Sequence, residues 1–220
     1  MAHLDTQLDS KPDTGRGALD FAALAATPCE RDPFDYVICP GFVRKDALAA
    51  IHADYPKIDK PGSFPYQTLE YGPAFASVIE ALQGPEMRRA IETVFGIDLE
   101  GRPTTVTVRG QCQQKDGRIH PDSSEKIVTV LVYLNPEWEE GGGRLRLLRS
   151  DSDIEDYAAE VPPNEGTLLA FLRSDTSFHG HKTYVGPRRV LQLNWVTGDR
   201  YAKRERRRHM VSSFFKRLGG

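Results

Sequence analysis

Cysteine, long apolar runs and net charge are all scarce in this sequence. Its three cysteines, Cys29, Cys39 and Cys112, show no CxxC spacing, which argues against a disulfide framework and against a zinc ribbon. The chain has no run of about 18 apolar residues, and its first residues are polar, so we expect neither a membrane span nor a signal peptide. A net charge of −2 gives no global attraction to nucleic acid. We therefore expect a cytoplasmic protein that does not bind nucleic acid.

The length of 220 residues suits one domain with terminal extensions. Residues 1–17 are polar without hydrophobic periodicity, and they predict a flexible arm. A single domain is expected over residues 18–199. The basic residues 200–220 predict a C-terminal helix or tail whose apolar side packs on the domain, although such a segment could also contact phosphates or a membrane surface.

Helical spacing of apolar residues dominates the first half of the chain. It predicts one helix that starts near Ala18 and stops before Pro28, and three more over residues 44–55, 74–82 and 86–95, bounded by proline or glycine. A short extended piece is expected over residues 36–38. Residues 18–100 are thus predicted to be a mainly helical support.

Beyond residue 104 the pattern changes to runs of β-branched and apolar residues separated by turn residues. These runs predict strands over residues 104–108, 127–134, 144–148, 166–172 and 189–196. No crossover helix of adequate length lies between them, so the sheets are expected to be antiparallel, either a sandwich or a closed jelly roll. The fold class is therefore α+β, with the β core over residues 104–197.

His120 and Asp122 are separated by one residue, and in an extended backbone residues two apart project to the same side. One metal ion could bind both, and a third imidazole would complete the set of two histidines and one carboxylate that suits Fe(II) and leaves positions open. His179 is the candidate, with His181 as the alternative, because both would face the same way on a strand. Taken alone, His120 and Asp122 could also be a loop histidine beside a solvated aspartate that bind no metal.

Arg189 opens the last predicted strand, where its planar guanidinium could bind a carboxylate through two hydrogen bonds. On that strand Arg189, Leu191, Leu193 and Trp195 share one face, and we expect this face to point into the barrel. A buried arginine would then need an anionic partner. Arg188, on the opposite face, is the alternative.

Several motifs occur in a specific order across residues 104–197. They are His120-Pro121-Asp122, the segment from Val128 to Asn135, the Gly142-Gly143 turn, the strand ending Leu169-Ala170-Phe171, and His179 followed by Arg189. In these motifs the sequence resembles the prolyl 4-hydroxylase-like branch of the Fe(II)/2-oxoglutarate-dependent dioxygenase superfamily. The first hundred residues resemble it only loosely.

The resemblance implies a double-stranded β-helix, a cupin-like jelly roll, with Fe(II) bound by His120, Asp122 and His179. It also implies that 2-oxoglutarate pairs its distal carboxylate with Arg189 and Tyr133, and it makes ascorbate a candidate reductant. Thr129 shares a face with Tyr133 and is expected to line the same pocket.

One departure from the family pattern lies upstream of the metal motif. The family often has a tyrosine there, whereas this chain has Arg109-Gly110-Gln111-Cys112-Gln113. Gln111 and Gln113 are the candidates to replace that tyrosine.

The implied activity is the hydroxylation of an unactivated C–H bond, with O₂ and 2-oxoglutarate consumed and succinate and CO₂ released. The organic substrate is expected to be a peptidyl proline or a small metabolite, and the sequence does not specify an oligomeric state.

Basic residues such as Lys126 and Arg144 could steer an acidic substrate or protect a strand edge. Two alternatives stay open: a non-catalytic metal-binding jelly roll that acts as a sensor or binding module, and a cupin-like metalloenzyme that does not use 2-oxoglutarate.

Overall fold

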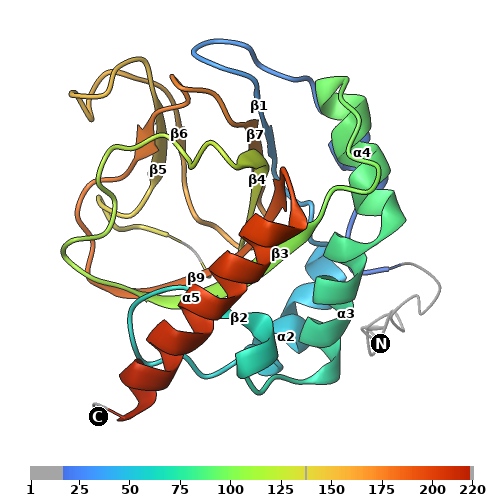
Figure 1. The fold of residues 1–220 in the computed structure, drawn as a ribbon, viewed down its shortest axis with the longest axis vertical. Helices are drawn as coiled ribbons and strands as arrows, with labels where there is room; N and C mark the ends of the chain where they lie inside the picture. Colours follow the sequence, from blue (N-terminus) through green and yellow to red (C-terminus); the bar gives the residue numbers. More distant parts are fainter. Residues whose placement is uncertain (1–16, 137, 219–220) are drawn as a thin grey trace, which may run out of the picture.

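The structure, a computed structural model, describes residues 17–136 and 138–218 (Figure 1). Almost all of the arm predicted over residues 1–17 therefore lies outside the described residues. Most of the helices pack on one side of a large antiparallel sheet, and a small sheet lies on the other side. This arrangement confirms the α+β class and the antiparallel pairing predicted from the sequence.

The helices follow the predicted order closely. They are α1 (Phe21–Ala26), α2 (Lys45–Ala53), α3 (Pro73–Gln83), α4 (Pro85–Phe95) and α5 (Asp199–Leu218), with a 3-10 turn, η1 (Tyr66–Thr68). Helices α3 and α4 each begin with a proline directly after a glycine, because proline at the first helical position loses no intrahelical hydrogen bond. Helix α4 ends at Gly96, whose φ of 66° is the left-handed conformation that glycine adopts readily. None of the described helices is both long and apolar enough to cross a membrane.

Nine strands form two antiparallel sheets in the described residues. They are β1 (Tyr36–Cys39), β2 (Phe64–Pro65), β3 (Thr104–Cys112), β4 (Lys126–Tyr133), β5 (Leu145–Leu148), β6 (Tyr157–Val161), β7 (Leu168–Leu172), β8 (His179–Gly180) and β9 (Gly186–Val196). The large sheet has the order β1-β7-β4-β9-β3-β2, and the small sheet has the order β6-β5-β8. The five predicted strands are all present, whereas β2, β6 and β8 were not predicted.

The two faces of the large sheet have different neighbours. Val130, Leu191, Leu193 and Trp195 belong to the main core, which also contains the buried side chains of α2, α3 and α4. The alternate residues face the small sheet, where Tyr133 packs in a second cluster with residues of β5 and β6. The expectation that the Arg189 face of β9 points into the barrel is therefore wrong, because the apolar residues of that face pack against the helices.

Candidate metal centre and its pocket

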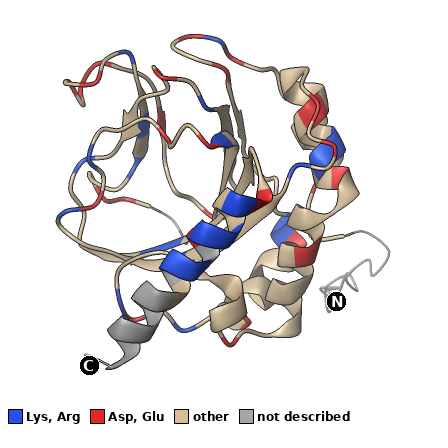
Figure 2. Ribbon diagram, in the orientation of Figure 1, with Lys and Arg blue, Asp and Glu red and all other residues tan. Residues whose placement is uncertain are grey.

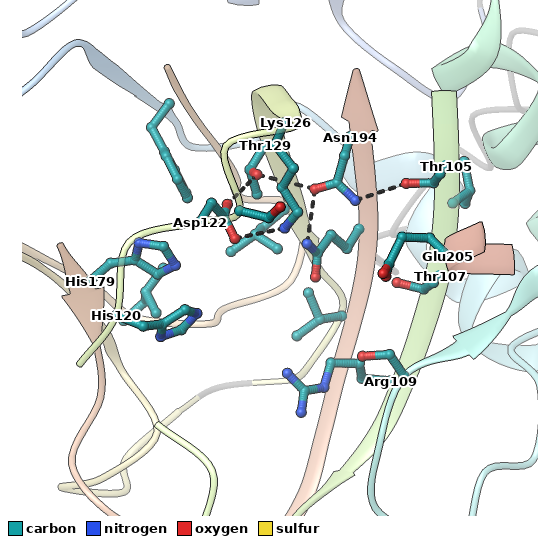
Figure 3. Close-up of a pocket in the computed structure, with 18 of the residues that line it drawn as sticks. Thr105, Thr107, Arg109, His120, Asp122, Lys126, Thr129, His179, Asn194 and Glu205 are labelled. Atoms are coloured by element: carbon teal, nitrogen blue, oxygen red, sulfur yellow. Dashed lines mark hydrogen bonds and ion pairs between the residues drawn. The ribbon is translucent and has the colours of Figure 1, made fainter. Parts of the chain in front are cut away.

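A cavity of about 420 Å³ lies on the face of the large sheet that is turned toward the small sheet. Its walls come from β3, β4, β7 and β9 of the large sheet, from β5 and β8 of the small sheet, and from α5. His120, Asp122 and His179 all border it, and Figure 3 shows these three side chains together at one side. The candidate site is therefore built between the two sheets.

A pair of backbone hydrogen bonds holds the two histidines side by side. His120 donates its N–H to the carbonyl of His179, and His179 donates to the carbonyl of His120, both at 3.1 Å. This isolated antiparallel bridge ties the segment before β4 to the short strand β8. The two imidazole rings consequently lie 4.5 Å apart between centroids.

The ring nitrogens of both histidines have fixed roles. Nδ1 of His120 lies 2.8 Å from the carbonyl oxygen of Arg118, and Nδ1 of His179 lies 2.9 Å from that of Ser177. A carbonyl oxygen only accepts, so each Nδ1 carries a proton. This leaves Nε2 of each ring as the nitrogen that is free to face a metal.

Asp122 completes the group. One ligand atom from each of His120, Asp122 and His179 can be chosen so that all lie within 4.8 Å of one another. The carboxylate is buried, and both of its oxygens have partners: Oδ1 lies 2.7 Å from Nζ of Lys126, and Oδ2 accepts from the Thr129 hydroxyl at 2.5 Å. These contacts orient the carboxylate.

The local electrostatics favour the protonation states that a metal needs. Burial lowers the pKa of His179 to about 4, so its ring is neutral at neutral pH. Burial alone would raise the pKa of Asp122, but Lys126, His179 and the Thr129 hydrogen bond outweigh it and lower the pKa. His179 therefore offers a neutral imidazole and Asp122 a carboxylate.

A second polar pair lies deeper in the molecule. Arg188 lines the cavity and donates through Nε to the carbonyl of Gly143 at 2.8 Å, and its guanidinium lies over the ring of Tyr133. Both side chains are buried, and Nη2 of Arg188 and the hydroxyl of Tyr133 have no hydrogen-bond partner. Since an unpaired buried donor is costly, this pair requires an acceptor.

Arg189 lies on the other face of β9. Its guanidinium lies over the ring of Tyr55, 5.1 Å from the centroid, and Nη1 is 3.4 Å from Nδ1 of His52. His52 in turn pairs with Glu165 at 2.7 Å. The structure therefore places Arg188, and not Arg189, in the cavity, because alternation along β9 sends Arg189 to the helix side of the sheet.

Residues 110–197 match the family model of the 2OG-Fe(II) oxygenase superfamily. The metal triad, Tyr133 and Arg188 all lie within that range. This part of the chain is therefore similar to the 2OG-Fe(II) oxygenase superfamily.

Solved structures share the fold of this chain at low sequence identity. A prolyl-4-hydroxylase from Pseudomonas putida is 17% identical with a TM-score of 0.52, covering 80% of this chain and 90% of the other. A prolyl 4-hydroxylase from Phytophthora capsici is 18% identical with a TM-score of 0.56, covering 86% and 69%. HygX from Streptomyces hygroscopicus, solved with nickel and 2-oxoglutarate bound, is 12% identical with a TM-score of 0.52, covering 74% and 82%. No curated protein matches by sequence comparison.

The cofactors of this superfamily, Fe(II) and 2-oxoglutarate, fit the residues present. Two imidazoles and a carboxylate are the ligand set that suits non-haem Fe(II). The unpaired donors of Arg188 and Tyr133 suit the distal carboxylate of 2-oxoglutarate. Groups that suit each of these cofactors therefore lie in or beside one cavity.

The remaining predicted residues divide between the cavity and its surroundings. Thr129 lines the cavity, but its hydroxyl contacts Asp122. His181 is buried with Nε2 3.9 Å from Sγ of Cys112, and it does not belong to the compact group of ligand atoms. Gln111 and Gln113 do not line the cavity, whereas Arg109 does. The three cysteines are free, as expected.

Two polar residues of the site were not identified from the sequence. Lys126 was noted only as a charge near the motif, although it binds Asp122 four residues earlier. Asn194 was placed on the outer face of β9, yet its amide lies in the cavity, where its Nδ2 donates to the Thr105 hydroxyl at 3.1 Å. Spacing alone gives no signal for either contact, since the first depends on the path of the chain between Asp122 and β4 and the second on the pairing of Thr105 with Asn194 between β3 and β9.

Proposed function

We propose that this oxygenase hydroxylates an unactivated C–H bond, consumes O₂ and 2-oxoglutarate, and releases succinate and CO₂. One observation carries the proposal: the triad of His120, Asp122 and His179 shares a cavity with Arg188, whose Nη2, like the neighbouring Tyr133 hydroxyl, lacks an acceptor. A metal site alone would not need these donors. The facing sheets also support a double-stranded β-helix as the core of residues 104–197 within one domain.

Each residue has a definite task in the proposed site. His120, Asp122 and His179 hold Fe(II), which when bound supplies the oxidising chemistry with O₂ and 2-oxoglutarate. Arg188 and Tyr133 bind the distal carboxylate and so fix the orientation of 2-oxoglutarate. The cavity walls nearby include Leu131, Leu145, Phe171 and Val190, which exclude water beside its methylene carbons.

Thr129 and Lys126 act on the metal through Asp122. Their contacts to both oxygens of the carboxylate hold it in one orientation, as hydrogen-bonded partners of metal ligands commonly do. This role replaces the direct contact to 2-oxoglutarate predicted for Thr129. Ascorbate as a reductant and a cytoplasmic location stay predictions.

The substrate class has two candidates, a peptidyl proline and a small metabolite. The structures from Pseudomonas putida and Phytophthora capsici are described as prolyl 4-hydroxylases, which supports the first. At identities of 17% and 18%, the similarity shows a common fold but does not identify the substrate.

The test is succinate formation by anaerobically prepared protein that receives Fe(II) and 2-oxoglutarate and then oxygen. Slow turnover is expected without added substrate, and the His179→Ala variant should lose it. The absence of both succinate formation and 2-oxoglutarate binding would favour the non-catalytic binding module. Turnover that does not need 2-oxoglutarate would favour the cupin-like alternative.

A further inference from the structure

The cavity continues beyond the metal triad to a polar floor. Thr105 and Thr107 of β3 lie there beside Gln192 and Asn194 of β9. In Figure 3, Thr105, Thr107 and Glu205 lie on the opposite side of the cavity from His120 and His179. The amide of Asn194 accepts from Gln192 at 3.0 Å and donates to Thr105, so the floor is a connected set of hydrogen-bonding groups.

One face of α5 forms the outer wall of this part of the cavity. Tyr201, Arg204, Glu205 and Arg208 border the cavity, at the spacing i, i+3, i+4 and i+7 of a single helix face. The helix crosses in front of β3 and β9 in Figure 1, and its basic residues appear as blue bands in Figure 2. Tyr201 and Ala202 of this helix pack on Val196, while Arg204 and Arg208 are largely exposed, which agrees with the prediction of a C-terminal helix that exposes its charges.

The charges around the cavity are unbalanced. Five basic side chains border it among the described residues: Arg109, Lys126, Arg188, Arg204 and Arg208. Two carboxylates, Asp122 and Glu205, oppose them. The proposed function assigns Asp122 to the metal, together with its partner Lys126, and Arg188 to 2-oxoglutarate, which leaves Arg109, Arg204 and Arg208 against Glu205.

We propose that the primary substrate is a small polar anion. Its carboxylate or phosphate group binds Arg204 and Arg208, and its neutral polar groups bind the floor formed by Thr105, Thr107, Gln192 and Asn194. This inference rests on the proposed function, because it concerns the substrate of the same site. A cavity of about 420 Å³ that also holds 2-oxoglutarate suits a small molecule.

The two arginines are available for such a ligand. Arg204 pairs with Glu125 at 2.8 Å and Arg208 with Glu205 at 3.3 Å, and the two arginine side chains are 64% and 71% exposed. Exposed ion pairs of this kind stabilise a protein only weakly, so an entering anion can replace the carboxylate partner. An arginine matches the geometry of a carboxylate or phosphate with two hydrogen bonds.

The other arginines near the cavity are less suited to this task. Arg144 and Arg146, which follow the glycine turn, both pair with Glu160, and neither borders the cavity. Arg109 borders it but pairs with Asp116 at 3.5 Å. Arg204 and Arg208 therefore carry the proposal, and Arg109 adds to the local positive field.

The experiment uses inorganic phosphate as the probe and the full chain loaded with Zn(II) and saturated with 2-oxoglutarate. The ³¹P line width is measured as phosphate is titrated. We expect saturable broadening, with affinity about tenfold lower in Arg204→Gln and in Arg208→Gln, since each change removes a charged hydrogen-bonding partner of the phosphate. Arg207→Gln is the matched control, because Arg207 is exposed on the same helix but does not border the cavity.

Two results would overturn the inference. One is an absence of saturable phosphate binding, or an equal loss of affinity in Arg207→Gln, which would show a general charge effect. The other is a blocked, uncharged proline peptide that stimulates succinate formation equally in the unaltered protein and in the Arg204→Gln/Arg208→Gln variant. Metal and 2-oxoglutarate binding are measured first on the same preparation, and their absence would count against the proposed function instead.

Discussion

The guanidinium of Arg188 lies over the aromatic ring of Tyr133, 5.4 Å from its centroid, and each side chain keeps a buried donor without an acceptor. Burial raises the pKa of Tyr133, although the charge of Arg188 opposes this, so the hydroxyl keeps its proton and can donate. Two donors beside each other in a buried place attract an anion. This relationship is the physical basis for placing the distal carboxylate of 2-oxoglutarate there.

Replacing Thr129 by valine should weaken metal binding. The change keeps the shape of the side chain but removes the hydroxyl that donates to Oδ2 of Asp122. Loss of a hydrogen-bonded partner of a metal ligand typically lowers metal affinity by about 10–100-fold. Metal titration followed by calorimetry measures the effect, with Thr93→Val on the exposed side of α4 as the control. Equal affinities in Thr129→Val and the unaltered protein would remove Thr129 from the metal site.

Replacing Gly180 by alanine should disturb the pairing of the two histidine segments. A Cβ at this position would lie 2.8 Å from the carbonyl oxygen of Gly117 and 3.3 Å from the backbone of Ile119, directly before His120. We expect metal affinity to fall by at least about tenfold, because the backbone bridge between His120 and His179 must open.

The control for this change is Gly198→Ala, where a Cβ has no neighbour within 4 Å. Metal titration and thermal unfolding of both variants separate a local effect from a general loss of stability. Unchanged metal affinity in Gly180→Ala would show that the bridge does not position the ligands.

The metal-free protein should lose stability as the pH falls from 6.5 to about 4. The ordinary pKa of histidine is 6.5, and burial lowers that of His179 to about 4 in the folded protein. The unfolded chain takes up its proton first, so the stability that neutral His179 provides is present above pH 6.5 and is lost through this window. The full difference corresponds to roughly 3 kcal/mol.

Urea unfolding at pH 7 and pH 5 measures this dependence. His181, whose pKa burial also lowers to about 4, contributes in the same window, so the comparison is with His179→Gln. That variant should show a smaller loss between the two pH values. An identical loss in both proteins would mean that His179 does not titrate as the structure implies.

The proximity of His120 and Asp122 could be predicted from the sequence, because their two-residue spacing fixes a common direction on an extended backbone. Their role as metal ligands with His179 stays a prediction. The helices were also predictable, since proline and glycine mark their ends. Strand β6 was missed because Tyr157–Val161 is short and interrupted by two alanines, which give little alternation. Strand β8 has only two residues, which is too short for a pattern in the sequence, and it is defined by its pairing with β5.

The choice between Arg188 and Arg189 needed the structure. Alternation along β9 separates its residues into two sets but does not say which set faces the helices. Both faces of this sheet are covered, one by helices and the other by the small sheet. Burial therefore does not distinguish the face of Arg188 from that of Arg189, and the sequence analysis chose the Arg189 face for the cavity. The apolar set of Leu191, Leu193 and Trp195 packs on the helices, and the cavity takes the polar set.

The central claim is that Arg188 binds 2-oxoglutarate beside the metal triad, and calorimetric titration of 2-oxoglutarate into metal-loaded protein tests it most directly. Arg188→Met should weaken binding by at least about tenfold, because a charge-assisted hydrogen-bonding partner is lost. Arg189→Met removes the adjacent guanidinium, whose contacts are with Tyr55 and His52, and should leave the affinity unchanged. Weaker binding in Arg189→Met with full affinity in Arg188→Met would contradict the account.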